Sequence, residues 1–141
     1  MISKQSLYAL VTVVLAVAIS GCAGLPKGPS DEELIRESLN TWKTGVESED
    51  VDLMMTVVSE DFVGPEGASK PAFRQYIAAL FDNGTLLGAE MIIEGATPVI
   101  AGDMATVDNL GLSSSRGAVV IDFDLKKEED GVWRIVNMQA Y

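Results

Sequence analysis

Residues 119–126 read Val-Val-Ile-Asp-Phe-Asp-Leu-Lys, and this stretch decides the fold. Its apolar side chains recur at every second position from Val119 to Leu125, and charged side chains stand between them from Asp122 onward. Successive side chains of a β-strand point to opposite faces of a sheet. The alternation therefore predicts a strand with one buried face and one face in water, as in an antiparallel sheet that is covered on one side.

The same period of two holds along the chain that follows Gly84. It predicts strands at residues 86–93, 97–101, 104–112, 117–127 and 132–140. Short polar segments at residues 102–103, 113–116 and 128–131 have the composition of turns. Strands that are joined in order by short turns predict an antiparallel meander.

The residues before Gly84 have a helical period instead. Ser30 and Glu33 form a capping-box pattern, which predicts that a first helix starts here and ends near Glu47. The apolar residues that recur at helical spacing along it are Leu34, Ile35, Leu39, Trp42 and Val46.

Two further helices are predicted before the strands. Asp50 or Ser48 caps the second helix, whose apolar residues are Leu53, Met54, Val57 and Val58. Ser69 caps the third helix, with Pro71 in its first turn, where a missing N–H costs little. Residues 61–63 form a brief extended piece between the two helices. The buried side of the third helix is expected to consist of Phe73, Tyr76, Ile77, Leu80 and Phe81.

Three helices followed by a meander predict an α+β fold. The helix with Trp42, the second helix start at residues 50–53, the extended piece at 61–63 and the final strand at 130–137 resemble the nuclear transport factor 2-like superfamily. The resemblance spans nearly all of residues 31–141. It implies a cone, in which the three helices pack into the concave face of a curved antiparallel sheet and a pocket often remains at the wide end. Its motifs are short, so they identify a fold better than a function.

Charge and composition exclude several classes of function. The formal net charge is -11, with 21 acidic against 10 basic residues. A surface of that sign repels phosphate backbones, so we expect no nucleic-acid partner. The chain has no histidine, the commonest metal ligand and the side chain best suited to proton transfer near neutral pH. With one cysteine it also lacks a zinc-type cluster. The sequence therefore implies no metal and no cofactor.

The first 21 residues have the order of a secretory signal, with Lys4, an apolar run at residues 7–19 and then small residues. Residues 19–22, Ile-Ser-Gly-Cys, resemble the bacterial lipobox, in which lipid is attached to the cysteine and the signal is removed before it. We therefore expect a signal peptide over residues 1–21, a lipid anchor on Cys22 and a tether over residues 22–30. By the sorting rule of enteric lipoproteins, Ala23 favours the periplasmic face of the outer membrane if the host has one.

An uncleaved transmembrane helix is the alternative interpretation of this segment. No charge interrupts residues 5–26, which are long enough to span a bilayer. The strongly apolar part is shorter, however, and a cluster of small residues with Gly21 and Gly24 ends it. Cleavage and lipidation are the better interpretation.

Enzymes of the superfamily that this sequence resembles place a carboxylate or a histidine on the pocket wall. Burial there raises the pKa of a carboxylate toward neutrality. Asp108, in the middle of a predicted strand, is the best candidate for such a base, and its neighbour Asn109 must then face the other way. The simpler interpretation is that Asp108 faces water. Asp122 and Asp124 look like a carboxylate pair but belong to the wet face of their strand. Residues 113–116, Ser-Ser-Ser-Arg, are polar enough to bind an anion but have the composition of a hairpin turn.

The remaining candidates for a ligand site are neutral. Trp42 and Tyr76 could supply an indole wall and a hydroxyl group, although their helical spacing fits a place in the core. On the last strand, Asn137 and Gln139 share the predicted inner face with Trp133. Two amides on that face suit hydrogen bonding to a ligand better than proton transfer.

Three hypotheses for function follow. The leading one is a non-catalytic, membrane-tethered module whose cone holds a small apolar ligand or a protein partner. The alternative is an isomerase- or cyclase-type enzyme that uses Asp108 as its base, with Tyr76 or Asn137 as a hydrogen-bond donor. The third is an envelope component that forms a homodimer through its exposed sheet.

The anchor can be tested directly. Wild-type protein should incorporate metabolically supplied fatty acid, and Cys22→Ser should abolish the labelling because only a thiol accepts the diacylglycerol. The variant precursor should also remain uncleaved or be released. Failure of the wild-type protein to take up label would show that the lipoprotein interpretation is wrong.

Overall fold

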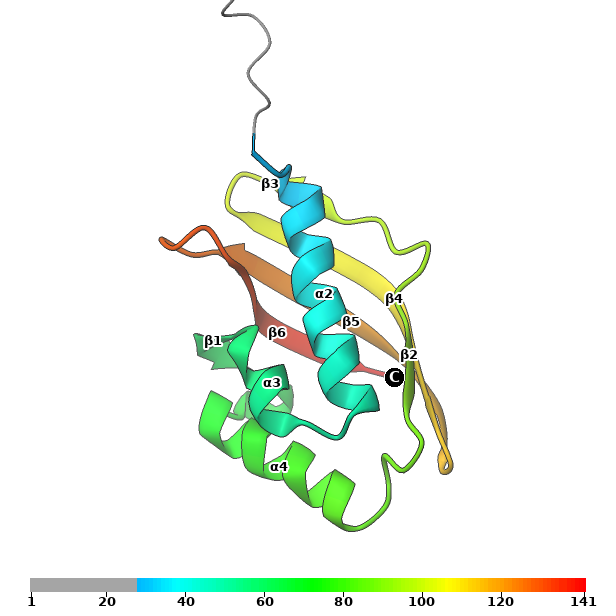
Figure 1. The fold of residues 1–141 in the computed structure, drawn as a ribbon. Helices are drawn as coiled ribbons and strands as arrows, with labels where there is room; N and C mark the ends of the chain where they lie inside the picture. The colour runs from blue at the N-terminus through cyan, green and yellow to red at the C-terminus, as the bar shows by residue number, and fades with distance from the viewer. Residues whose placement is uncertain (1–27) are drawn as a thin grey trace, which may run out of the picture.

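The computed structural model describes residues 28–141, and Figure 1 shows their fold. The predicted signal peptide, the predicted lipidation site Cys22 and residues 22–27 of the predicted tether lie outside the described residues. Within residues 28–141 the chain forms three α-helices and a six-stranded sheet, which confirms the α+β class. No helix in this part of the chain is long and apolar enough to cross a bilayer.

Helix α2 (Asp31–Glu47) begins at the predicted capping box. The Ser30 hydroxyl accepts a hydrogen bond from the Glu33 backbone N–H at 3.2 Å, and the Glu33 carboxylate accepts one from the Ser30 N–H at 2.7 Å. Three acidic residues occupy the first turn, where the helix dipole favours negative charge. The predicted apolar residues of this helix are buried, apart from the half-buried Leu34.

Helix α3 (Val51–Thr56) is capped by Asp50, whose carboxylate accepts from the Leu53 N–H at 2.9 Å. Ser48, the other predicted cap, instead ends α2. The helix is shorter than predicted, because Val58 starts strand β1 (Val58–Val63) and is not a helical residue. Backbone pairing accounts for the early end, since the Ile135 N–H donates to the Val57 carbonyl at 2.8 Å.

A 3-10 turn, η1 (Pro65–Gly67), leads into helix α4 (Lys70–Asp82). Phe73 and Ile77 are buried as predicted, but Tyr76 is 58% exposed. The expectation that Tyr76 lies on the buried side was therefore wrong. Helix α4 covers only the end of the sheet near β1 (Figure 1), so its buried stripe is narrower than its apolar stripe.

The sheet has the strand order β1-β6-β5-β4-β2, and β3 also pairs with β4. The remaining strands are β2 (Glu90–Ile92), β3 (Val99–Ala101), β4 (Met104–Ser114), β5 (Gly117–Lys127) and β6 (Trp133–Ala140). Antiparallel pairing of β4, β5 and β6 confirms the meander. The prediction of a wholly antiparallel sheet was wrong, because β1 pairs with β6 in parallel. Strand β2 is shorter than predicted because residues 83–88 form turns.

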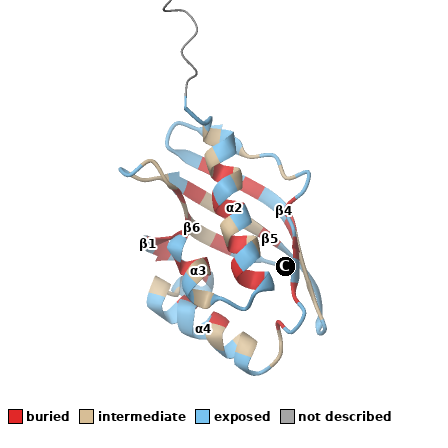
Figure 2. Ribbon diagram, viewed as in Figure 1, coloured by how far each residue is buried: buried red, intermediate tan, exposed pale blue. Residues whose placement is uncertain are grey.

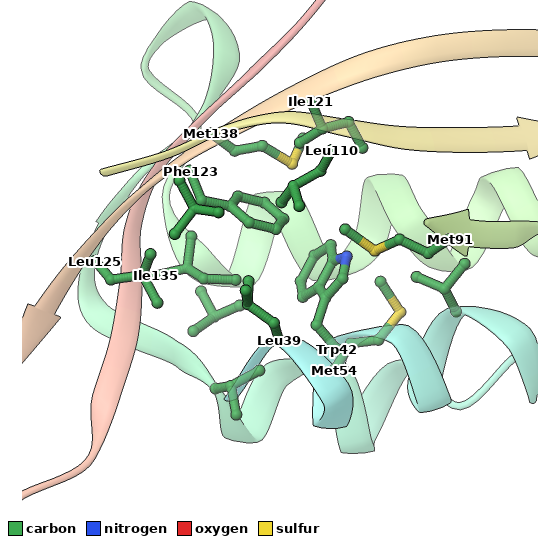
Figure 3. Close-up of a cluster of buried hydrophobic side chains, with 14 of the residues drawn as sticks. Leu39, Trp42, Met54, Met91, Leu110, Ile121, Phe123, Leu125, Ile135 and Met138 are labelled. Carbon is green, nitrogen blue, oxygen red and sulfur yellow. The ribbon is translucent and has the colours of Figure 1, made fainter. Parts of the chain in front are cut away.

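Helix α2 lies across one face of the sheet (Figure 1), and buried residues line that face (Figure 2). At the centre, Trp42 stacks on Phe73 with ring centroids 6.1 Å apart and meets Phe123 edge-on at 5.3 Å. Figure 3 shows its indole facing side chains of the strands, with Met54 and Met91 beside it. Among the described residues, the buried cluster runs from Ile35 to Met138.

Hydrogen bonds from Lys127 and from the buried Trp133 hold the N-terminus of α2 against the sheet. Asp31 accepts hydrogen bonds from the Lys127 ammonium at 2.7 Å and from the Trp133 indole N–H at 3.1 Å. About two turns further on, the Ser38 hydroxyl donates to the Trp133 carbonyl at 2.6 Å. The hydrogen bond from Lys127, followed by that from Trp133, holds the pKa of the Asp31 carboxyl below its usual value.

The two tryptophans should dominate the stability of the core. Trp42→Ala and Trp133→Ala should each lower the free energy of unfolding by about 3–5 kcal/mol, the usual cost of deleting a buried large aromatic side chain. Tyr141 is 70% exposed, so Tyr141→Ala serves as the control and should change stability by about 0.5 kcal/mol or less. Urea denaturation followed by circular dichroism measures these differences. Wild-type midpoints for both tryptophan variants would show that the inner faces are misassigned.

The depressed pKa of Asp31 predicts a dependence of stability on pH. A carboxylate of this kind stabilises the fold fully above its unfolded pKa of about 3.9, and the contribution is lost as the pH falls through the lower folded pKa. Asp31→Asn should therefore be less stable than wild type near neutral pH, and the difference should shrink below about pH 4. A difference that stays constant down to about pH 3 would contradict this role.

Candidate functional site

A cavity of about 360 Å³ lies between the three helices and the end of the sheet that contains the β4–β5 turn. Helices α2, α3 and α4 supply one wall through Trp42, Met54 and Leu80, and the β4–β5 hairpin and the end of β6 supply the other. The size lies within the usual range for small-molecule sites. At about 30 Å³ for each water molecule, the space is equivalent to about a dozen waters.

The side chains that line this cavity, called the inner cavity from here on, are mostly apolar. Among the described residues that line it, none is an aspartate or a glutamate, and the one charged side chain is Arg116. The other polar groups are the hydroxyls of Tyr76, Thr85 and Ser114. Such a lining can bind an apolar molecule, but it has no carboxylate that could remove a proton from it.

Trp42 connects the cavity to the core. Its side chain lines the cavity and is only 2% exposed. Its indole Nε1 is buried and has no hydrogen-bond partner within residues 28–141. A buried donor without a partner is unusual and costs stability. Trp42 therefore combines a place in the core with an unused donor beside the cavity.

An outer groove of about 660 Å³ adjoins the inner cavity. It lies between η1, the start of α4 and the end of β6, and it includes Gln139 and Tyr141. Tyr76 and Met138 line both hollows, so the exposed Tyr76 stands at their boundary. The Tyr141 hydroxyl donates to the Gln139 side-chain oxygen at 2.7 Å.

Asp108, the candidate base, lies on the outer face of the sheet and is exposed. Asp108 alternates with the buried Ala105 and Val107 of β4, and a β-bulge puts the next residue outward as well. Val107 pairs with Phe123, but Leu110 pairs with Ile121, so β4 has one more residue than β5 over this interval. Asn109 takes a left-handed conformation with φ +62°, and its N–H donates to the Asp122 carboxylate at 2.8 Å. The expectation that Asn109 faces away from Asp108 was wrong, because both are exposed.

A second bulge changes the inner face of β6. Asp124 pairs with Asn137 and Leu125 pairs with Ile135, which leaves Val136 as the extra residue. Phe123 pairs with Met138, and both are buried. Because cross-strand partners point to the same face, Asn137 and Gln139 lie with the outward Asp124 and Asp122. The expectation that these two amides share the inner face with Trp133 was wrong.

Trp42 and Tyr76, two candidate ligand-binding residues from the sequence, both line the inner cavity. Sequence reasoning missed Met138, because strict alternation from Trp133 puts that residue outside. It treated Arg116 as part of a turn, and the turn is confirmed but is limited to residues 115–116. No group of acidic or cysteine side chains within residues 28–141 is arranged to hold a metal ion.

No protein-family model matches the sequence, and no curated protein matches it. Solved structures match it by fold. One is a protein of unknown function with a cystatin-like fold from Nostoc punctiforme, with a TM-score of 0.64 and 21% identity over 78% of this chain and 89% of that one. Another is a nuclear transport factor 2-like protein of unknown function from Shewanella baltica, with a TM-score of 0.64 and 19% identity over 83% and 98% of the two chains.

A third similar structure is a provisionally assigned dehydratase of the nuclear transport factor 2-like family from Streptomyces avermitilis. Its TM-score is 0.63, with 15% identity over 78% of this chain and 94% of that one. At these identities the likeness establishes the fold alone. The described domain has the nuclear transport factor 2-like cone fold that the resemblance implied.

Proposed function

We propose that this protein is a membrane-anchored, non-catalytic module whose inner cavity binds a small apolar ligand. The observation that carries the proposal is the lining of that cavity, which combines buried aromatic and aliphatic side chains with no carboxylate. Ligand sites of this kind are concave and mostly apolar, with a few polar groups that fix orientation. The neutral polar side-chain groups on the lining are the hydroxyls of Tyr76, Thr85 and Ser114.

The membrane location rests on the sequence. The apolar run at residues 7–19 and the lipobox-like residues 19–22 support lipid attachment at Cys22. One acyl chain gives only marginal binding to a bilayer, whereas the several chains of a mature bacterial lipoprotein give stable anchoring. A domain held at a membrane in this way is well placed to receive or deliver apolar molecules, because such molecules concentrate in the bilayer.

The alternative function is an isomerase- or cyclase-type enzyme, and the similar dehydratase-type structure is the observation that favours it. Such chemistry needs a base within hydrogen-bond reach of the substrate. Asp108 lies on the opposite face of the sheet from the inner cavity, so an enzyme of this type would need another base. The binding module is therefore the better supported proposal.

The binding proposal can be tested with neutral alcohols. Hexan-1-ol, octan-1-ol and decan-1-ol should bind to the domain of residues 23–141 and change the fluorescence of Trp42. Each added methylene contributes about 0.8 kcal/mol, or about fourfold in Kd, until the cavity is full. Native mass spectrometry of the freshly purified domain should also detect a retained apolar molecule.

A matched pair of variants makes this test specific. Leu112 lines the inner cavity and is half-buried, so Leu112→Trp should fill the cavity and abolish binding of the alcohols. Val120 lies on the neighbouring strand, is exposed and does not line the cavity. Val120→Trp should bind as wild type does. Equal binding by both variants, or no binding by wild type, would contradict the proposal.

A further inference from the structure

Arg116 occupies a defined place at the rim of the inner cavity. It lies in the two-residue turn between β4 and β5, and its backbone N–H donates to the Ser114 hydroxyl at 3.2 Å. That hydrogen bond stabilises the conformation of the turn. The Arg116 side chain is exposed, but it lines the same hollow as Trp42 and Leu112. The cavity thus has an apolar interior and a cationic rim.

The charge of Arg116 has no ion-pair partner within residues 28–141. The chain contains 21 acidic residues, and most cationic side chains of the described part lie against one of them. Those with a carboxylate partner are Arg36, Lys43, Lys70, Arg74, Lys127 and Arg134. Arg116 and Lys126 form no ion pair within residues 28–141, and of these two Arg116 alone lines the cavity.

We propose that the ligand is a single-chain amphiphile with a carboxylate head, which Arg116 holds at the rim while the alkyl chain fills the inner cavity. This inference rests on the proposed binding function and names its ligand class. A guanidinium group matches a carboxylate with two parallel hydrogen bonds. A volume of about 360 Å³ suits one alkyl chain of moderate length.

The strongly acidic composition does not prevent the binding of an anion at this rim. The lining within the described residues contains no carboxylate that would repel it. At physiological ionic strength the Debye length is about 8 Å, so exposed carboxylates farther away are largely screened. Among the described residues that line the cavity, Arg116 is the one charged side chain that an incoming carboxylate meets.

The test compares decanoate with decan-1-ol, which have the same chain length and different head groups. Wild-type domain should bind decanoate more tightly than decan-1-ol. Because the pair at the rim is partly exposed to water, Arg116→Gln should weaken decanoate binding by about fivefold to tenfold. The same variant should leave the Kd of decan-1-ol within about twofold. Arg116→Lys keeps the charge but lacks the planar guanidinium group. Its Kd for decanoate should therefore lie between the values for wild type and Arg116→Gln.

Arg74→Gln is the matched control, because Arg74 is an exposed arginine that pairs with Asp52 and does not line the cavity. It should change neither Kd. If decan-1-ol binds and decanoate binding is insensitive to Arg116→Gln, the carboxylate inference is wrong and the binding function stands. If Arg116→Gln weakens the binding of decanoate and of decan-1-ol to the same extent, the carboxylate inference is also wrong, because Arg116 would then only shape the rim. If neither ligand binds the wild-type domain, the proposed function itself fails.

Discussion

Packing of helix α2 against the sheet is the constraint on which the rest of this structure depends. Trp42 reaches from that helix to Phe123 on β5 and to Phe73 on α4, so one side chain joins three elements. The Ser38 hydroxyl and the Asp31 carboxylate bind Trp133 from the same helix. At the other end of the helix the Met91 N–H donates to the Glu47 carboxylate, and Trp42 and Val46 line the inner cavity.

The sequence predicted the elements well and the faces of two strands poorly. The capping box at Ser30 and the alternation over residues 119–126 are local signals, and local structure follows them. The bulges in β4 and β6 are set by pairing with β5, and a single strand does not record how its partner is aligned. Each bulge shifts the alternation by one position. The shift in β6 is why Asn137 and Gln139 were placed on the inner face and why Met138 was missed, whereas Asp108 is exposed, as the simpler interpretation had it.

The outer face of the sheet bears on the hypothesis of a homodimer. Asp108 is exposed there, and Asp122 and Asp124 are half-buried on the same face. A symmetric dimer sets the same patch of both subunits against itself, which would bring these carboxylates together across the contact. Like charges that face each other are destabilising. The acidic outer face therefore counts against a dimer through the middle of the sheet, and oligomeric state stays a hypothesis.

The parallel pairing of β1 with β6 has a consequence for how the chain is made. Val58 lies beside Ile135, and Asp31 touches Trp133, so β1 and the N-terminus of α2 reach these partners only when the last strand is present. Contacts between residues so distant in sequence slow folding, because the intervening loop must close before they form. During synthesis β1 has no strand to pair with until β6 has emerged. A nascent chain of this topology stays incompletely folded for most of its translation, which is the condition that export in an unfolded state requires.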